Sequence, residues 1–311
     1  MKTRNSRAPV QTANTEFNQV FTGESRRRRP DRPADGALLP VHGTIEAPIV
    51  VVGATGTIGQ ALVRQLVASG QPVVAVAAQF DGLAGLREAA TPGAVTPIVG
   101  RIDTDADAQR LADQLRALDR PLAGVVVTFP HGRAAEAGRG RLLEQPTEVL
   151  NDCIEQTVIA QHALARHLIP LLAESGRNTR YVIVGGPGSE TPWAGYGQRS
   201  VAMAATRMLA RVLHDEARAS GVRVQLLSID SPVRSEEPGD HECPEWPAAS
   251  DVARSVARLV DRRSTDESTD AIVTCARSTS ACSSGPLTRR FRDVPSLLES
   301  LRNATNKITP Q

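Results

Sequence analysis

A short apolar run followed by three evenly spaced glycines constrains the fold of this chain more than any other feature. Residues 49–52 are Ile-Val-Val-Val, a β-branched run typical of a strand buried on both faces of a parallel sheet. Gly53, Gly56 and Gly59 follow, and residues 60–70 then carry apolar side chains at the helical period. The pattern predicts a strand, a glycine-rich turn and a helix in direct succession.

This arrangement favours binding of a dinucleotide. A second apolar run at residues 73–77 supplies the next strand of the unit. Glycines let backbone N–H groups approach a pyrophosphate, and the helix N-terminus adds about half a positive charge. The alternative is a tight strand-to-helix turn without a ligand. The predicted cofactor contacts are Gly53, Thr55, Gly56, Thr57, Ile58 and Gly59.

Strand-like apolar runs and helix-like amphipathic segments continue to alternate along the chain. Apolar runs predict further strands at residues 95–99, 122–128, 180–185, 222–229 and 270–275. Amphipathic periods predict helices at residues 81–90, 105–118, 146–174, 195–220 and 248–262. Strands that alternate with helices indicate an α/β fold, here a Rossmann-type, doubly wound parallel sheet in a single domain.

Both ends of the chain differ in composition from this middle part. Residues 1–45 have few apolar side chains and contain a run of four arginines at 26–29. We expect a disordered basic tail there rather than an export signal, because no apolar segment follows the arginines. Residues 278–311 predict a C-terminal tail with a short helix near 294–302, which leaves 46–277 as the α/β domain.

Charge and cysteine usage restrict the partners and the compartment. The formal net charge is +2, and residues 1–35 hold eight basic and four acidic residues, so the remainder carries −2. The rest of the chain therefore lacks the excess of positive charge that is typical of nucleic-acid-binding proteins. The absence of an apolar run of about 18 residues argues against a membrane span.

Four cysteines without a CxxC pair predict a reduced, cytoplasmic chain. His162 and His167 lie five residues apart, which is poor spacing for metal ligands, so no metal site is expected.

The order of these elements resembles the short-chain dehydrogenase/reductase family over about residues 48–276. The resemblance rests on the glycines at 53–59, on Tyr196 near the start of a long helix, and on Gly221-Val-Arg-Val224. It implies an oxidoreductase that transfers hydride between NAD or NADP and a carbonyl or alcohol, a small-molecule substrate that the sequence does not name. Residues 77–79, Ala-Ala-Gln, supply neither the acid nor the arginine that would choose between the two cofactors.

The resemblance also implies roles for individual residues. In the family, a tyrosine is the general acid and base, a lysine four residues later lowers its pKa, and an earlier serine binds the substrate oxygen. Tyr196 matches the tyrosine, Arg199 is the nearest cation and Ser189 is the nearest serine. Thr128, at the end of the fourth predicted strand, is expected to contact the cofactor.

The chain departs from the family at the lysine. Position 200 is a serine, and the only lysines are Lys2 and Lys307 in the two tails. Thr157 stands where the family has a helical asparagine. Two hypotheses follow: an oxidoreductase in which Tyr196 has an unusual helper, or an impaired member that binds a dinucleotide as a sensor, scaffold or subunit. Because Tyr196 lacks a cation four residues later, we expect weak or absent dehydrogenase activity, and we expect Ser200→Lys to raise it if the rest of the site is intact.

The two long helices predicted at 146–174 and 195–220 carry more apolar positions than one covered sheet requires. In relatives this pair of helices builds the subunit interface, so the resemblance implies a symmetric homodimer. The alternative is that these apolar residues only cover the sheet.

Overall fold

The computed structural model describes one α/β unit. The described residues are 46–128, 140–176, 178–236, 243–261 and 269–275, and all belong to the compact unit Ile45–Gln311. The predicted tails at 1–45 and 278–311, including the short helix near 294–302, lie outside the described residues.

The described strands form one parallel sheet in the order β3-β2-β1-β4-β5-β6-β7. The strands are β1 Ile49–Val52, β2 Val73–Ala77, β3 Val95–Val99, β4 Gly124–Thr128, β5 Thr179–Val184, β6 Val222–Ser228 and β7 Ile272–Thr274. β1 pairs with β2 on one side and with β4 on the other, so the winding direction reverses beside β1. This topology confirms the predicted Rossmann-type, doubly wound sheet.

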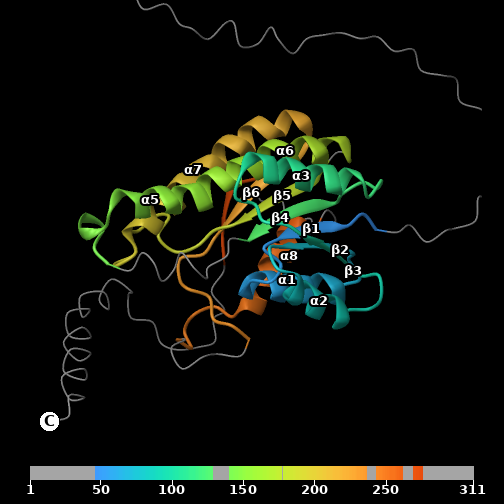
Figure 1. Ribbon diagram of the computed structural model, residues 1–311, viewed down its shortest axis with the longest axis horizontal. Helices are drawn as coiled ribbons and strands as arrows, with labels where there is room; N and C mark the ends of the chain where they lie inside the picture. Colours follow the sequence, from blue (N-terminus) through green and yellow to red (C-terminus); the bar gives the residue numbers. More distant parts are fainter. Residues whose placement is uncertain (1–45, 129–139, 177, 237–242, 262–268, 276–311) are drawn as a thin grey trace, which may run out of the picture. The chain divides into compact units, whose positions relative to one another are not determined.

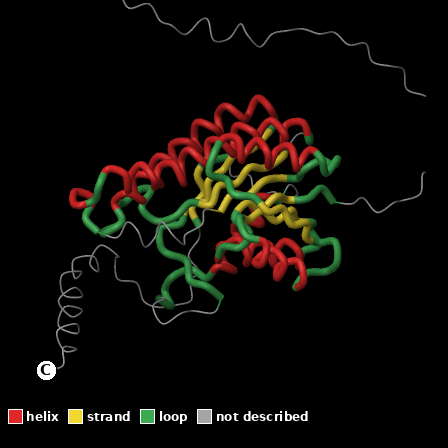
Figure 2. The backbone as a smooth tube through the Cα atoms, in the orientation of Figure 1, coloured by secondary structure: helices red, strands yellow, loops and turns green. Residues whose placement is uncertain are grey.

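Helices cover both faces of this sheet, as Figures 1 and 2 show. The helices are α1 Thr57–Ala68, α2 Phe80–Glu88, α3 Asp105–Arg116, α5 Thr147–Ile154, α6 Ala160–Glu174, α7 Gly197–Ala217 and α8 Ala249–Val260. One layer holds α1, α2 and α8, and the other holds α3, α6 and α7 (Figure 1). Short 3-10 turns occupy Leu142–Glu144 and Arg218–Ser220.

The β-branched run of β1 supplies both cores. Ile49 and Val51 pack into the core beneath α1 and α8, while Val50 and Val52 pack into the core beneath α3 and α6. Successive side chains of a strand point to opposite faces, so a sheet covered on both sides requires an unbroken apolar run.

The long helix predicted at 146–174 is interrupted. A π-helical turn at Glu155–Ile159 separates α5 from α6. Such a turn holds one extra residue per turn and often marks a functional site. It packs against α7 and includes Thr157, where the family resemblance expects an asparagine.

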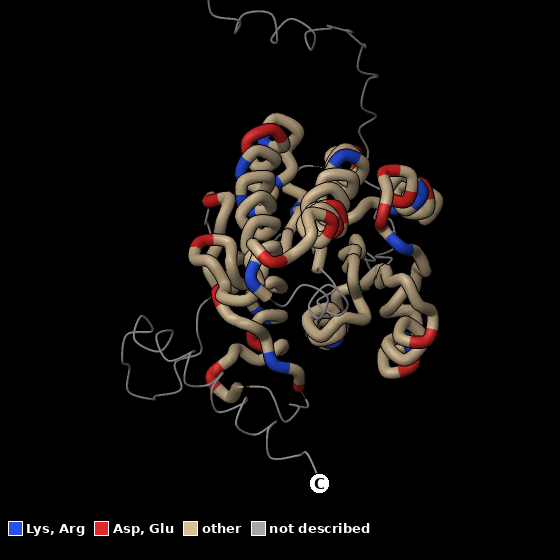
Figure 3. Tube along the Cα trace, turned by 60° about the vertical axis from the view of Figure 1, so that its left-hand side comes forward, with Lys and Arg blue, Asp and Glu red and all other residues tan. Residues whose placement is uncertain are grey.

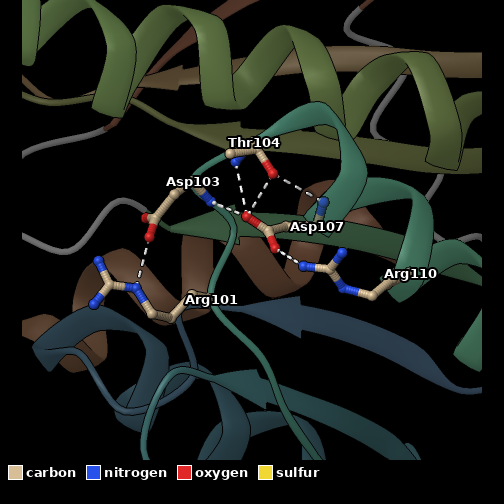
Figure 4. A network of polar contacts seen from close by, with 5 residues as sticks. All are labelled: Arg101, Asp103, Thr104, Asp107 and Arg110. Atoms are coloured by element: carbon tan, nitrogen blue, oxygen red, sulfur yellow. Dashed lines mark hydrogen bonds and ion pairs between the residues drawn. The ribbon is translucent and has the colours of Figure 1, made fainter.

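Side chains close the N-terminus of α3, as Figure 4 shows. The Thr104 hydroxyl accepts the Asp107 N–H at 3.2 Å, and the Asp107 carboxylate accepts the Thr104 N–H at 2.9 Å. Arg110 pairs with the same carboxylate, and Arg101 pairs with the neighbouring Asp103. The hydrogen bond from the Thr104 hydroxyl lowers the pKa of Asp107. This capping box occupies donors that would otherwise be open to a ligand.

Basic and acidic residues alternate along the helices in Figure 3, in keeping with the small net charge of the sequence after residue 35. Within the described ranges, no helix is both long and apolar enough to cross a membrane.

Candidate functional site

The turn after β1 ties together three strand ends. The N–H groups of Gly53 and Ala54 donate to the Val76 carbonyl at 2.9 and 3.0 Å, and the Thr128 hydroxyl donates to the Val52 carbonyl at 2.9 Å. Gly53 has a φ of +82°, and a Cβ there would overlap the backbone and lie 2.5 Å from the Thr128 hydroxyl oxygen. Only glycine fits at this position.

Gly56 and Gly59 differ in what the protein itself requires of them. A Cβ on Gly59 would overlap the Gly53 carbonyl oxygen and lie 2.9 Å from the Ala54 Cα atom. A Cβ on Gly56 would meet nothing nearer than the Gly53 carbonyl oxygen at 3.4 Å, an ordinary contact. Packing of α1 against the turn therefore demands glycine at 59, whereas only a ligand would demand it at 56.

The N-terminus of α1 is open, in contrast to that of α3. Gly56 caps α1 without a side chain, and the first turn has no acidic residue. Among the described residues, no acceptor takes the N–H groups of Thr57, Ile58 or Gly59. Three outward donors and the helix dipole suit an anion such as a pyrophosphate.

The other predicted cofactor residues shape this turn. The Ile58 side chain is buried in the core, so only its backbone can meet a ligand, while Thr57 is exposed. Thr55 lies between the turn and α2: its carbonyl accepts the Gln60 amide at 2.8 Å, and its methyl group packs beside Gly82. Thr128 is buried beneath the turn, where its hydroxyl already donates to the Val52 carbonyl.

The loop between β5 and α7 holds the second half of the site. Tyr196 ends this loop as the N-cap of α7, and its ring stacks on Trp193 with centroids 4.2 Å apart and an interplanar angle of 25°. The Arg199 guanidinium carbon lies 5.7 Å from the Trp193 ring centroid, within cation–π range. Because parallel strands share their carboxyl edge, this loop emerges at the same edge as the glycine turn.

The π-helical turn and the end of α5 complete this cluster. Burial lowers the pKa of Arg199, and the neighbouring Cys153 and Tyr196 act in the opposite direction. Burial raises the pKa of Cys153, partly offset by a hydrogen bond with Thr157 and by the Arg199 charge. The structure therefore brings Tyr196 and Arg199 together with Cys153 and Thr157.

Ser200 lies outside this cluster and holds the loop instead. Its hydroxyl accepts the Trp193 N–H at 2.9 Å and donates to the Tyr196 carbonyl at 3.2 Å. Gly188, with φ +102°, passes so close that a Cβ there would lie 2.7 Å from the Ser200 hydroxyl oxygen. The expected gain from Ser200→Lys is therefore revised, because a lysine side chain there would displace the loop that carries Tyr196.

Ser189 is half-buried in this loop. The hydrogen bonds of the described residues do not connect it with Tyr196. The next residue, Glu190, pairs with Arg207 of α7, which also donates to the Ser228 hydroxyl at 3.3 Å. Ser189 therefore precedes a residue, Glu190, that an ion pair holds against α7.

Trp193 and Cys153 were not among the site residues predicted from the sequence. Trp193 lies three residues before Tyr196, and Cys153 lies one helical turn before Thr157. Their positions beside predicted site residues were the available signal, although only the tertiary contacts show that they meet Arg199.

The fold and glycine turn define a dinucleotide-binding type of α/β protein, and comparison identifies the family. The family model for short chain dehydrogenases matches residues 47–231, more than half of the chain. The chain belongs to the short-chain dehydrogenase family, which confirms the resemblance found in the sequence.

The two most informative relatives are only 27% and 30% identical to this chain. An uncharacterized oxidoreductase from Mycobacterium tuberculosis is 27% identical over 184 residues, which cover 58% of this chain and 65% of that protein, slightly less than two thirds. A 1-deoxy-11-beta-hydroxypentalenate dehydrogenase from Streptomyces avermitilis is 30% identical over 193 residues, covering 59% of this chain and 69% of that protein.

Among solved structures, L-sorbose reductase from Gluconobacter frateurii, complexed with NADPH and L-sorbose, shares the fold. Its TM-score is 0.63 at 18% identity, and the match covers 76% of this chain and 98% of that chain.

The role of Ser200 yields a stability prediction. Ser200→Ala leaves the Trp193 N–H without its acceptor and should lower the free energy of unfolding by about 1–3 kcal/mol. Ser200→Lys should lower it further, because its longer side chain meets Gly188. Denaturant unfolding measures both effects, with Ser250→Ala as the control. Wild-type stability in Ser200→Lys, together with higher activity, would contradict this role.

Proposed function

We propose that this chain is an NAD(P)-dependent oxidoreductase acting on a carbonyl or alcohol. The carrying observation is that Tyr196 and Arg199 both lie against the Trp193 ring, in a loop at the carboxyl edge of the sheet where the glycine turn also lies. Family membership supports the same reaction class. We also propose a cytoplasmic location, which the free thiols of Cys153, Cys243 and Cys275 support and which cell fractionation tests.

The glycine turn is the proposed cofactor site. The N–H groups of residues 57–59 would hold the pyrophosphate, and the bare Gly56 leaves room for it. In this proposal Thr128 positions the turn through the Val52 carbonyl. The solved L-sorbose reductase binds NADPH. Neither an acid nor a base follows β2 at residues 78–80, so the proposal covers both NAD and NADP.

The bound nicotinamide would supply or accept the hydride. Tyr196 would donate a proton to the carbonyl oxygen in reduction and accept one from the alcohol in oxidation. Arg199 would stabilise negative charge that develops on the phenol oxygen, the task that the family gives to a lysine. The stack on Trp193 would hold the Tyr196 ring in position.

A second candidate function has its own support. Ser200 fills the lysine position and holds the loop, and glycines occupy positions 185 and 186, where the family usually has serines. These features favour a member that binds the dinucleotide as a sensor, scaffold or subunit without turnover.

Tyr196→Phe tests the proposed reaction. With a panel of neutral ketones and aldehydes and both cofactors, the variant should lose about 10²–10⁴-fold in kcat. Its affinity for the cofactor, followed by nicotinamide fluorescence, should equal that of the wild type. Wild-type turnover that survives Tyr196→Phe would refute the role of Tyr196. A wild type that binds the cofactor but turns over no carbonyl would establish the second candidate.

The cofactor site predicts opposite behaviour for two glycine variants. Gly56→Ala should keep wild-type stability and weaken cofactor binding at least about tenfold, because the added methyl group meets only the ligand. Gly59→Ala should lower the free energy of unfolding by about 1–3 kcal/mol, because the helix must move off the turn. Calorimetry with NADH and NADPH, paired with denaturant unfolding, separates the two effects. Full cofactor affinity in Gly56→Ala would place the ligand elsewhere.

We propose a homodimer through α7 and the π-helical turn. Val201, Met208 and Val212 lie 42–55% exposed on α7, and Ile159 of the π-helical turn is 51% exposed. The spacing of the three α7 residues places them on one helix face. An apolar face of this kind suits an isologous contact with a second copy.

Met208→Glu should therefore convert a dimer to a monomer, as light scattering at tens of micromolar would show. Leu143→Glu, which changes a 92% exposed residue outside this surface, is the matched control and should leave the mass unchanged. A monomeric wild type at the same concentration would rule the dimer out.

A further inference from the structure

Arg199 is half-buried, and in the part of the chain that the structure describes no carboxylate pairs with its charge. Its guanidinium group carries five N–H donors. Within the described ranges, none of the hydrogen bonds or ion pairs includes this side chain. By contrast, Arg207, on the same helix, pairs with Glu190 and donates to the Ser228 hydroxyl.

The neighbours of Arg199 do not neutralise it. Burial raises the pKa of the Cys153 thiol, which keeps the thiol protonated and uncharged at neutral pH. The Trp193 ring, with its centroid 5.7 Å away, offers only a cation–π contact. A guanidinium group stays charged in proteins, so removing it from water without an anion is unfavourable.

We propose that Arg199 binds a carboxylate of the substrate. The planar guanidinium can hold both carboxylate oxygens at once. Because Arg199 lies one helical turn after Tyr196, the carboxylate would lie a few bonds from the carbonyl that Tyr196 protonates. The substrate class is thus an oxo acid or the corresponding hydroxy acid. This assignment of substrate rests on the proposed oxidoreductase function.

A phosphate of the cofactor could supply the same negative charge, and binding measurements distinguish the two sources. If Arg199 holds the substrate, Arg199→Gln should leave the dissociation constants of NADH and NADPH unchanged. If it holds a cofactor phosphate, the same substitution should weaken cofactor binding, and that result would overturn the proposal.

The binding test uses Trp193 as the reporter. Trp246→Phe makes Trp193 the only tryptophan of the chain, and its stacking on Tyr196 should make its fluorescence sensitive to a neighbouring ligand. Titrations with pyruvate, acetoacetate and levulinate, each against its methyl ester, should show at least one acid binding about tenfold or more tighter than its ester. Arg199→Gln should abolish this preference, Arg199→Lys should retain part of it, and Arg211→Gln, which changes an exposed residue of the same helix, should keep all of it.

The kinetic test separates substrate binding from assistance to Tyr196. If Arg199 holds the carboxylate, Arg199→Gln should lower kcat/KM for the acid about tenfold more than for its ester. If Arg199 only assists Tyr196, kcat/KM should fall equally for both. Equal loss, or equal binding of every acid and ester by the wild type, would overturn the proposal.

The two proposals can fail separately. Carboxylate binding that depends on Arg199 without turnover of any carbonyl would support the anion site but refute the oxidoreductase. Turnover of neutral ketones that depends on Tyr196, without a preference for acids, would do the reverse. Circular dichroism of Arg199→Gln and Arg199→Lys excludes unfolding as the cause of lost binding.

Discussion

The structure depends on how closely the backbone of α1 approaches the turn after β1. Gly59 packs directly on the Gly53 carbonyl, and the turn is tied to β2 through Val76 and to β4 through Thr128. This contact lets α1 begin at the carboxyl edge of the central strands, where the N–H groups of residues 57–59 have no acceptor among the described residues. A side chain at position 59 would separate the helix from the sheet and move both the core and the proposed ligand site.

At the start of α7, two neighbouring residues have different roles because their side chains point in different directions. Adjacent residues on an α-helix point about 100° apart, so Arg199 and Ser200 face different surroundings. Ser200 faces the loop and ties Trp193 to the first turn of α7, whereas Arg199 faces Tyr196 and Cys153. In the proposed reaction, the guanidinium group of Arg199, three residues after the tyrosine, takes the role that the family gives to a lysine four residues after it.

Sequence patterns predicted the fold well because the central strands of a sheet covered on both sides have to be apolar on both faces. The run at Ile49–Val52 and the glycines after it leave few alternatives to a Rossmann-type unit. The π-helical turn at Glu155–Ile159 escaped prediction because its side chains fit an ordinary helix equally well. The orientation of Ser200 and the stacking of Trp193 depend on how the β5–α7 loop folds back, and no local periodicity encodes that.

The most direct test of this account is a crystal structure of the complex with whichever of NADH and NADPH binds more tightly. We expect a pyrophosphate oxygen within hydrogen-bond distance of the N–H groups of Ile58 or Gly59, and the nicotinamide ring beside the Tyr196 hydroxyl. A pyrophosphate bound away from the N-terminus of α1, or a nicotinamide remote from Tyr196, would contradict the account.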